Sequence, residues 1–205
     1  MRYLLLSSCV VVLLGCSSAY KHLQVTPGDA RNLQQFKPVF PVALYKASID
    51  VVGNHLSGLL IIKRMPDRST RMVFSNEIGF KFFDFQFLPG GGFKVFSIVD
   101  QINKKALIKT LRQDFELIMM YRTDSADALI RKNDSLLYYT FHPPNGYYHY
   151  ITSLPGDQLV RMERSSKRKI IMEAIMKNYI KGIPDTIGIT HKNFNFTIGL
   201  KRIAR

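Results

Sequence analysis

The sequence predicts a mainly β fold of the α+β type, with one large curved antiparallel sheet and a single amphipathic helix packed on it. Short segments rich in Val, Ile, Phe and Tyr recur along the chain, separated by Gly, Pro, Asn and Asp residues. One segment, residues 103–121, has the apolar spacing of a helix. The chain of 205 residues is long enough to bury a full hydrophobic core.

The expected strands follow one another closely, as in a meandering antiparallel sheet. They cover residues 42–52, 56–64, 71–75, 80–88, 93–99, 128–131, 134–142, 147–154, 158–164, 170–179, 186–191 and 194–202. Turn signals separate them, among them Gly53-Asn54, Gly90-Gly91-Gly92 and Gly182-Ile183-Pro184. Aromatic side chains at successive positions of residues 80–88 predict a central strand that is covered on both faces.

The helix at residues 103–121 has an apolar face and a charged face. The apolar face contains Leu107, Ile108, Leu111, Phe115, Ile118 and Met119. We expect this face to cover the sheet. A basic helix on a membrane surface is the alternative, but one apolar face cannot cover a sheet and enter lipid at the same time.

The chain begins with Met1-Arg2, followed by an apolar run over residues 3–14 and by Gly15-Cys16. This run is too short to span a bilayer, which takes about 20 apolar residues, and it has the pattern of a secretory signal. We expect a signal peptide at residues 1–15. Residues 16–38 lack periodicity and contain Pro27, Gly28 and Pro38, which predicts a tether with one helical turn near residues 30–35. We expect residues 39–205 to form a single β-rich globular domain.

The run Leu13-Leu14-Gly15-Cys16 resembles the lipobox of bacterial lipoproteins. The resemblance implies that Cys16 receives a diacylglyceryl group, with acyl chains such as palmitate, and becomes the first residue after cleavage. The alternative is an ordinary signal peptide or a buried N-terminal helix with a chance cysteine. Since Cys9 lies in the leader, the mature chain would have no disulfide. No acidic run follows Cys16. Such a run resembles the surface-export signal of Bacteroidetes lipoproteins, so we expect an outer-membrane lipoprotein that faces the periplasm.

The formal net charge of +14 predicts a basic surface. Such a surface favours anionic partners such as phospholipid headgroups, although a generic solvated surface is equally consistent with it. We expect no nucleic acid as a partner, because a secreted lipid-anchored chain rarely meets it.

The hairpin around Asn145-Gly146 predicts two faces. A two-residue loop sets His142 opposite His149, and a four-residue loop shifts the register by two without exchanging the faces. Either loop puts the histidines on one face as an exposed pair. The other face carries the aromatic side chains Tyr139, Phe141, Tyr148 and Tyr150. No third ligand is spaced to complete a metal site, so we expect no metal.

Catalytic motifs are weak in this sequence. Ser166 and Lys169 have the Ser-x-x-Lys spacing but lie in a charged turn, and the glycine run lacks the Lys-Ser/Thr of a phosphate loop. No tight carboxylate pair suggests acid–base catalysis. We expect no enzyme and no cofactor, while an envelope hydrolase assembled from distant residues remains a third hypothesis.

The leader, the tether and a sheet with a helix on it together resemble the lipoprotein carrier fold of LolA and LolB. Segments such as Phe74-Ser75-Asn76-Glu77-Ile78-Gly79 and Asn193-Phe194-Asn195-Phe196 are similar to uncharacterised Bacteroidetes lipoproteins. The resemblance implies a half-barrel that wraps around helices, with an apolar cavity for acyl chains. It also implies a non-enzymatic protein that binds or carries an apolar or lipid-like ligand.

The expected ligand-binding residues are aromatic and aliphatic side chains of the sheet and the helix: Phe85, Phe87, Leu111, Phe115, Ile118, Tyr139, Phe141, Tyr148 and Tyr150. A basic rim from Lys105, Lys109, Arg112 and the turn at 164–169 would meet anionic headgroups. The same aromatics would also fill a packed core. The alternative function is therefore an accessory or scaffold lipoprotein of an envelope protein complex.

Overall fold

The computed structural model describes residues 19–124, 127–144 and 146–203. The predicted signal peptide and Cys16 lie outside these residues. The strands are β1 (Gln24–Val25), β2 (Val42–Val51), β3 (Asn54–Arg64), β4 (Thr70–Ser75), β5 (Lys81–Phe87), β6 (Phe93–Ile98), β7 (Leu129–Lys132), β8 (Leu136–Phe141), β9 (Tyr147–Ser153), β10 (Leu159–Ser165), β11 (Ile170–Ile180), β12 (Ile183–His191) and β13 (Phe196–Arg202). The helices are α1 (Lys105–Ile118) and the 3₁₀ turns η1 (Ala30–Phe36), η2 (Pro89–Gly91), η3 (Asp100–Ile102) and η4 (Tyr121–Asp124).

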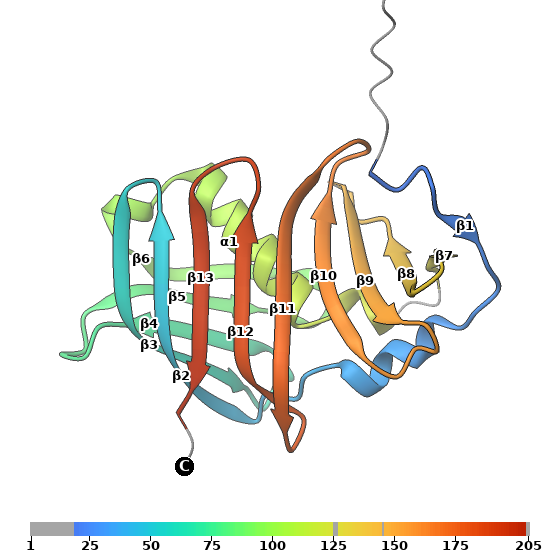
Figure 1. The fold of residues 1–205 in the computed structure, drawn as a ribbon. Helices are drawn as coiled ribbons and strands as arrows, with labels where there is room; N and C mark the ends of the chain where they lie inside the picture. Colours follow the sequence, from blue (N-terminus) through green and yellow to red (C-terminus); the bar gives the residue numbers. More distant parts are fainter. Residues whose placement is uncertain (1–18, 125–126, 145, 204–205) are drawn as a thin grey trace, which may run out of the picture.

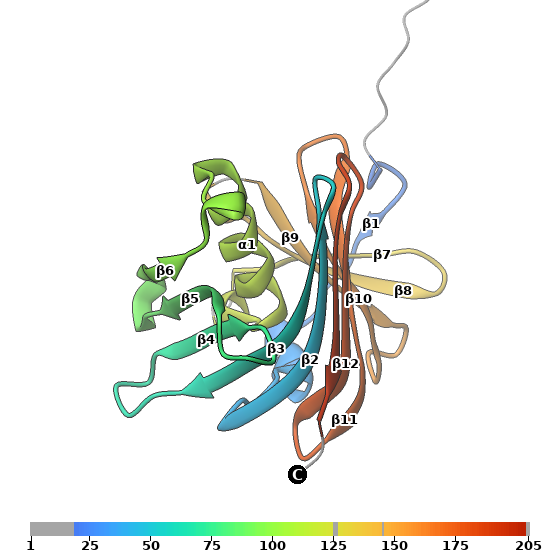
Figure 2. The ribbon, with the colours of Figure 1, turned by 90° about the vertical axis from the view of Figure 1, so that its left-hand side faces the viewer.

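All these strands form one antiparallel sheet in the order β1-β7-β8-β9-β10-β11-β12-β13-β2-β3-β4-β5-β6. The last strand, β13, pairs with β2 and joins the two halves of the meander. The sheet bends around α1, which lies in its hollow (Figures 1 and 2). The predicted fold class, a large curved antiparallel sheet with one amphipathic helix packed on it, is confirmed. No helix among the described residues is long and apolar enough to cross a membrane.

Two hairpins close through tight turns with positive φ at both central residues, the geometry that matches strand twist. Val52 and Gly53 have φ of 46° and 81°, and Lys181 and Gly182 have φ of 52° and 75°. The predicted turn Gly182-Ile183-Pro184 is therefore one residue too late, since Ile183 and Pro184 already belong to β12. The turn needs only two residues, so the strand resumes earlier than the proline suggested.

The apolar face of α1 is buried against the sheet, as predicted. Phe115 is fully buried, and its ring centroid lies 5.9 Å from that of Phe83. The helix is shorter than the expected 103–121, because Met120 takes a positive φ of 54° and the chain continues as η4.

The prediction that residues 80–88 form a central strand is wrong. Strand β5 is the second strand from the edge of the sheet, beside the edge strand β6. Phe83, Phe85 and Phe87 are buried in the main core. Asp84, between them in sequence, pairs instead with Arg71 at 2.8 Å. The aromatic content of this strand reflects how one face packs on α1 rather than a place in the middle of the sheet.

A buried ionic cluster ties α1 to the sheet. The Asp114 carboxylate accepts from Arg164 Nη2 of β10 at 3.1 Å and contacts His191 Nε2 of β12 at 2.7 Å. Gln113 Oε1 accepts from Arg164 Nη1 at 3.0 Å. Asp114 is fully buried, and Arg164 and His191 are each 6% exposed. Arg164 is thus part of the interior and not of the predicted basic rim.

The segment predicted as a tether is folded onto the domain from residue 19 onward. Strand β1 pairs with β7. The expected helical turn is η1, where the Arg31 amide donates to the side chain of the N-cap residue Asp29. Leu33 is fully buried in the main core. The apolar residues of this segment are too few and too scattered to show a period, so only tertiary packing reveals them.

Replacement of Asp114 by Asn should destabilise the protein strongly. The substitution leaves Arg164 buried without its carboxylate, which costs about 3–5 kcal/mol of unfolding free energy. Urea unfolding measures this loss. Glu173→Gln is the control, because it breaks the partly exposed pair with Lys192 and should cost at most about 1 kcal/mol. Equal losses in the two variants would contradict a structural role for the cluster.

Candidate functional site

A pocket of about 800 Å³ lies at the end of the half-barrel where α1 finishes. Four segments that are distant in sequence line it: residues 34–40 in and after η1, the β3–β4 turn, the loop of η2, and the chain from Glu116 to Asp124. In Figure 1, η1 lies at the lower side of the sheet, and α1 runs down towards it. The volume is within the range of about 300–1,000 Å³ that is usual for small-molecule sites.

Apart from Thr70, the buried residues that line the pocket are apolar. Phe40 and Met119 are 7% and 2% exposed, and Leu88 and Tyr121 are half-buried. The Tyr121 hydroxyl donates to Thr70 Oγ1 at 2.8 Å, which fixes the ring. Burial raises the pKa of Tyr121 above its usual value, so the phenol stays neutral at physiological pH.

The rim of the pocket is charged. Arg64, Arg68 and Arg122 line it and are exposed. Glu116, on the same pocket, accepts from Arg112 Nε at 2.7 Å. Arg112 also donates to the carbonyl of Gly91 at 2.7 Å, so α1 holds the η2 loop in place.

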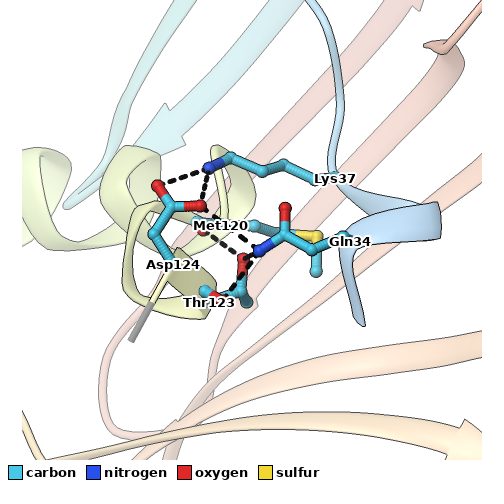
Figure 3. A network of polar contacts seen from close by, with 5 residues as sticks. All are labelled: Gln34, Lys37, Met120, Thr123 and Asp124. Carbon is cyan, nitrogen blue, oxygen red and sulfur yellow. Dashed lines mark hydrogen bonds and ion pairs between the residues drawn. The ribbon is translucent and has the colours of Figure 1, made fainter. Parts of the chain in front are cut away.

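A polar clasp joins η1 to η4 beside the pocket (Figure 3). Lys37 Nζ contacts both carboxylate oxygens of Asp124, at 2.6 and 2.7 Å. Gln34 Nε2 donates to the Thr123 carbonyl at 2.8 Å, and Thr123 Oγ1 donates to the Met120 carbonyl at 2.8 Å. The clasp holds Gln34 and Lys37, which belong to the segment predicted as a tether, against the end of α1. This contact completes the pocket wall.

The residues predicted to bind ligand lie together in the core around α1. All of them are at most 3% exposed: Phe85, Phe87, Leu111, Phe115, Ile118, Tyr139, Phe141, Tyr148 and Tyr150. None of them lines the large pocket. Leu111 alone among them borders a second cavity, of about 10 Å³, which has room for about one water molecule. Ligand binding by these side chains stays a prediction.

The hairpin of β8 and β9 has the predicted faces. Phe141 pairs with Tyr148 and Thr140 pairs with His149, which is the register of the four-residue loop. The expectation of an exposed histidine pair is wrong for His149, which is 3% exposed. The ring of Tyr20 stacks on it with centroids 4.1 Å apart, so the N-terminal segment covers this histidine.

One contact resembles a nucleophile with its base. His149 Nε2 lies 2.8 Å from Ser165 Oγ, and His149 Nδ1 lies 3.0 Å from Thr140 Oγ1. Ser165 is fully buried. Burial, followed by the nearby charge of Arg131, lowers the pKa of His149 to about 3. This imidazole is a poor base near neutral pH, and the pair is closed to a substrate. Among the described residues, no three His, Cys, Asp or Glu side chains gather as metal ligands.

The protein should lose stability in acid through His149. The unfolded histidine titrates near pH 6.5 and the folded one near 3, so below pH 6.5 the unfolded state binds more protons. The free energy of unfolding should therefore fall as the pH drops from 6.5 to 3, by up to about 1.4 kcal/mol per pH unit. Urea unfolding at several pH values measures this slope. His149→Gln should lack this part of the slope, and an unchanged slope in that variant would contradict the assignment.

No protein-family model matches this sequence, and no curated protein matches it. Solved structures are similar in shape. A LolA superfamily protein from Nitrosomonas europaea aligns with a TM-score of 0.49 and 8% identity, over 87% of this chain and 93% of that one. A DUF1329 family protein from Desulfovibrio piger aligns with a TM-score of 0.45 and 12% identity, over 85% and 88%.

A domain from Vibrio parahaemolyticus, provisionally named as an outer membrane lipoprotein-sorting protein, aligns with a TM-score of 0.43 and 10% identity. The alignment covers 86% of this chain and 90% of that domain. These similarities are ones of general shape, and no function is carried over from the three proteins.

Proposed function

We propose that this protein is a non-enzymatic lipoprotein of the outer membrane that binds a lipid-like ligand in the pocket at the end of its half-barrel. The observation that carries the proposal is the pocket of about 800 Å³. The buried side chains of Phe40 and Met119 form part of its inner wall. A wall of this kind removes apolar ligand surface from water, which contributes about 25 cal/mol per Å².

Ala19, the first residue that the structure describes, lies at the other end of the sheet from this pocket. The Ala19 amide donates to the carbonyl of Arg168 at 3.4 Å, beside the β10–β11 turn, and Cys16 precedes Ala19 by only three residues. That turn and η1 lie at opposite ends of the sheet in both ribbon views (Figures 1 and 2). Acyl chains on Cys16 would thus hold the pocket away from the membrane, open to the periplasm.

The predicted aromatic site adjoins this pocket. The Phe87 ring lies 6.5 Å from that of Tyr121, which lines the pocket, and Ile118 precedes the pocket residue Met119 in the chain. A ligand tail that reached deeper would meet these two predicted residues first. The remaining members of the predicted set would then act as the packed support behind the wall.

An accessory or scaffold role is the second candidate, and the packed interior favours it. Strand β6 is an edge of the sheet, and on it Val95 and Phe96 are 40% and 54% exposed. Phe80, just before β5, is 55% exposed. Exposed apolar side chains on a sheet edge are suited to a protein partner in the cell envelope.

A fatty acid with a photoactivatable diazirine should label the pocket. In envelopes that contain the full lipidated chain, we expect cross-links to peptides with Phe40, Leu88 and Met119, mapped by mass spectrometry. Leu88→Asp should reduce labelling about tenfold, because a charge replaces an apolar wall contact. Leu154→Asp, at an exposed leucine outside the pocket, is the matched control. Labelling that Leu88→Asp does not reduce would contradict this pocket as the site. Labelling mainly on β8 and β9 would contradict it as well.

The scaffold candidate makes a different prediction. A photo-crosslinking amino acid in place of Phe96 should capture one discrete envelope protein, because this side chain lies on the free edge of the sheet. The same residue in place of Val25, which is 70% exposed on the opposite edge strand β1, should capture none. Absence of a discrete product at Phe96, or the same product at both positions, would count against a partner on the β6 edge.

A further inference from the structure

We propose that the pocket selects ligands with an anionic head, a carboxylate or a phosphate monoester, which Arg64, Arg68 and Arg122 bind at its rim. This inference rests on the proposed function and adds the chemical class of the ligand. The three arginines come from the end of β3, the β3–β4 turn and η4. All three line the pocket of about 800 Å³. Among the described residues, none of their guanidinium groups forms an ion pair with a carboxylate.

The carboxylates around the pocket are already engaged. Asp124 pairs with Lys37 and Glu116 pairs with Arg112. Asp67, next to Arg68 in sequence, accepts from the amide and the hydroxyl of Ser69 at 2.9 and 2.6 Å. These hydrogen bonds lower the pKa of Asp67, so the carboxylate stays ionised and is held within the turn. The three arginines therefore leave an excess of positive charge at the rim.

The backbone holds these arginines next to the apolar wall. The Arg64 amide donates to the Phe40 carbonyl at 3.1 Å, so its Cα is fixed beside a wall residue. The β3–β4 turn is closed by the bond from the Arg68 amide to the Met65 carbonyl, at 2.9 Å. Arg122 follows Tyr121 and precedes Thr123, both of which are tied by hydrogen bonds. The fold thus fixes the backbone positions from which these three exposed side chains reach the rim.

Guanidinium groups pair with carboxylates and phosphates through two parallel hydrogen bonds, which makes Arg more selective for such heads than a simple positive charge. An apolar wall with arginines at its mouth matches an amphiphile whose tail enters and whose head remains at the rim. A neutral head would leave the guanidinium groups with water as their only partners. The overall net charge of +14 alone would attract anions everywhere and would give no preference at this mouth.

The test compares three photoactivatable probes with the same hexadecyl tail and a carboxylate, a phosphate monoester or a hydroxyl head. The full lipidated chain is reconstituted in nanodiscs of zwitterionic phospholipid, and half-maximal labelling of the pocket peptides is measured. The triple variant Arg64→Gln, Arg68→Gln, Arg122→Gln removes the rim charges. The matched control removes the same number of charges at the opposite end, as Lys167→Gln, Arg168→Gln, Lys169→Gln. All six side chains are exposed, and urea unfolding checks that both variants fold.

We expect the anionic probes to reach half-maximal labelling at a concentration about tenfold or more below that of the alcohol. The pocket triple should abolish this preference and leave the alcohol unchanged, while the control triple should keep it. The two anionic arms show whether carboxylate or phosphate is preferred. Equal labelling by all three probes would overturn the proposed selectivity for an anionic head, and so would an equal loss of the anionic preference in both triple variants. Neither result would contradict the pocket as the binding site. No labelling of the pocket by any probe would overturn the proposed function as well.

Discussion

The buried carboxylate of Asp114 is the constraint on which the rest of the structure depends. A charge in the interior is tolerated only when partners satisfy it, and here the partners come from two different strands, Arg164 on β10 and His191 on β12. The helix can therefore take only one depth and one rotation in the hollow of the sheet. With α1 fixed in this way, the aromatics of β5, β8 and β9 pack around it and the interior is closed.

The fixed helix also determines where the pocket lies. Space remains where α1 ends, because the chain turns away at Met120 and continues as η4. The clasp between Lys37 and Asp124 sets η1 across this opening. The pocket is thus a consequence of helix length, a positive φ and one ion pair, and not of an opening between the helix and the sheet.

The sequence alone predicts the features that depend on local periodicity. The strands, the single helix and the aromatic face of the β8–β9 hairpin follow from alternation and from turn residues, and the structure has them. The burial of Asp114 could not be predicted in this way. A carboxylate in an amphipathic helix is expected on the solvent-exposed face, and its two partners lie 50 and 77 residues away in the sequence. The burial of His149 was missed for the same reason, since the ring that covers it belongs to Tyr20 in the segment expected to be a tether.

The pocket could not be predicted, because no single segment of the sequence contains it. Phe40, Arg64, Leu88 and Met119 lie in four segments that only the tertiary fold brings together. The local signals were each ambiguous: two arginines that flank a turn, a glycine run and the end of an amphipathic helix. The aromatic residues form a stronger sequence pattern, so the predicted binding site fell in the core. There, packing of the rings against one another is enough to explain why these residues are aromatic.

Hydrogen exchange of the full chain, with and without hexadecyl phosphate, tests the central claim that a ligand binds in the pocket at the end of the half-barrel. The account predicts slower exchange at the β3–β4 turn, the η2 loop and residues 119–124, with α1, β8 and β9 unchanged. Faster exchange along α1, β8 and β9 would contradict it, since that result would mean that the helix moves and the ligand enters the aromatic core.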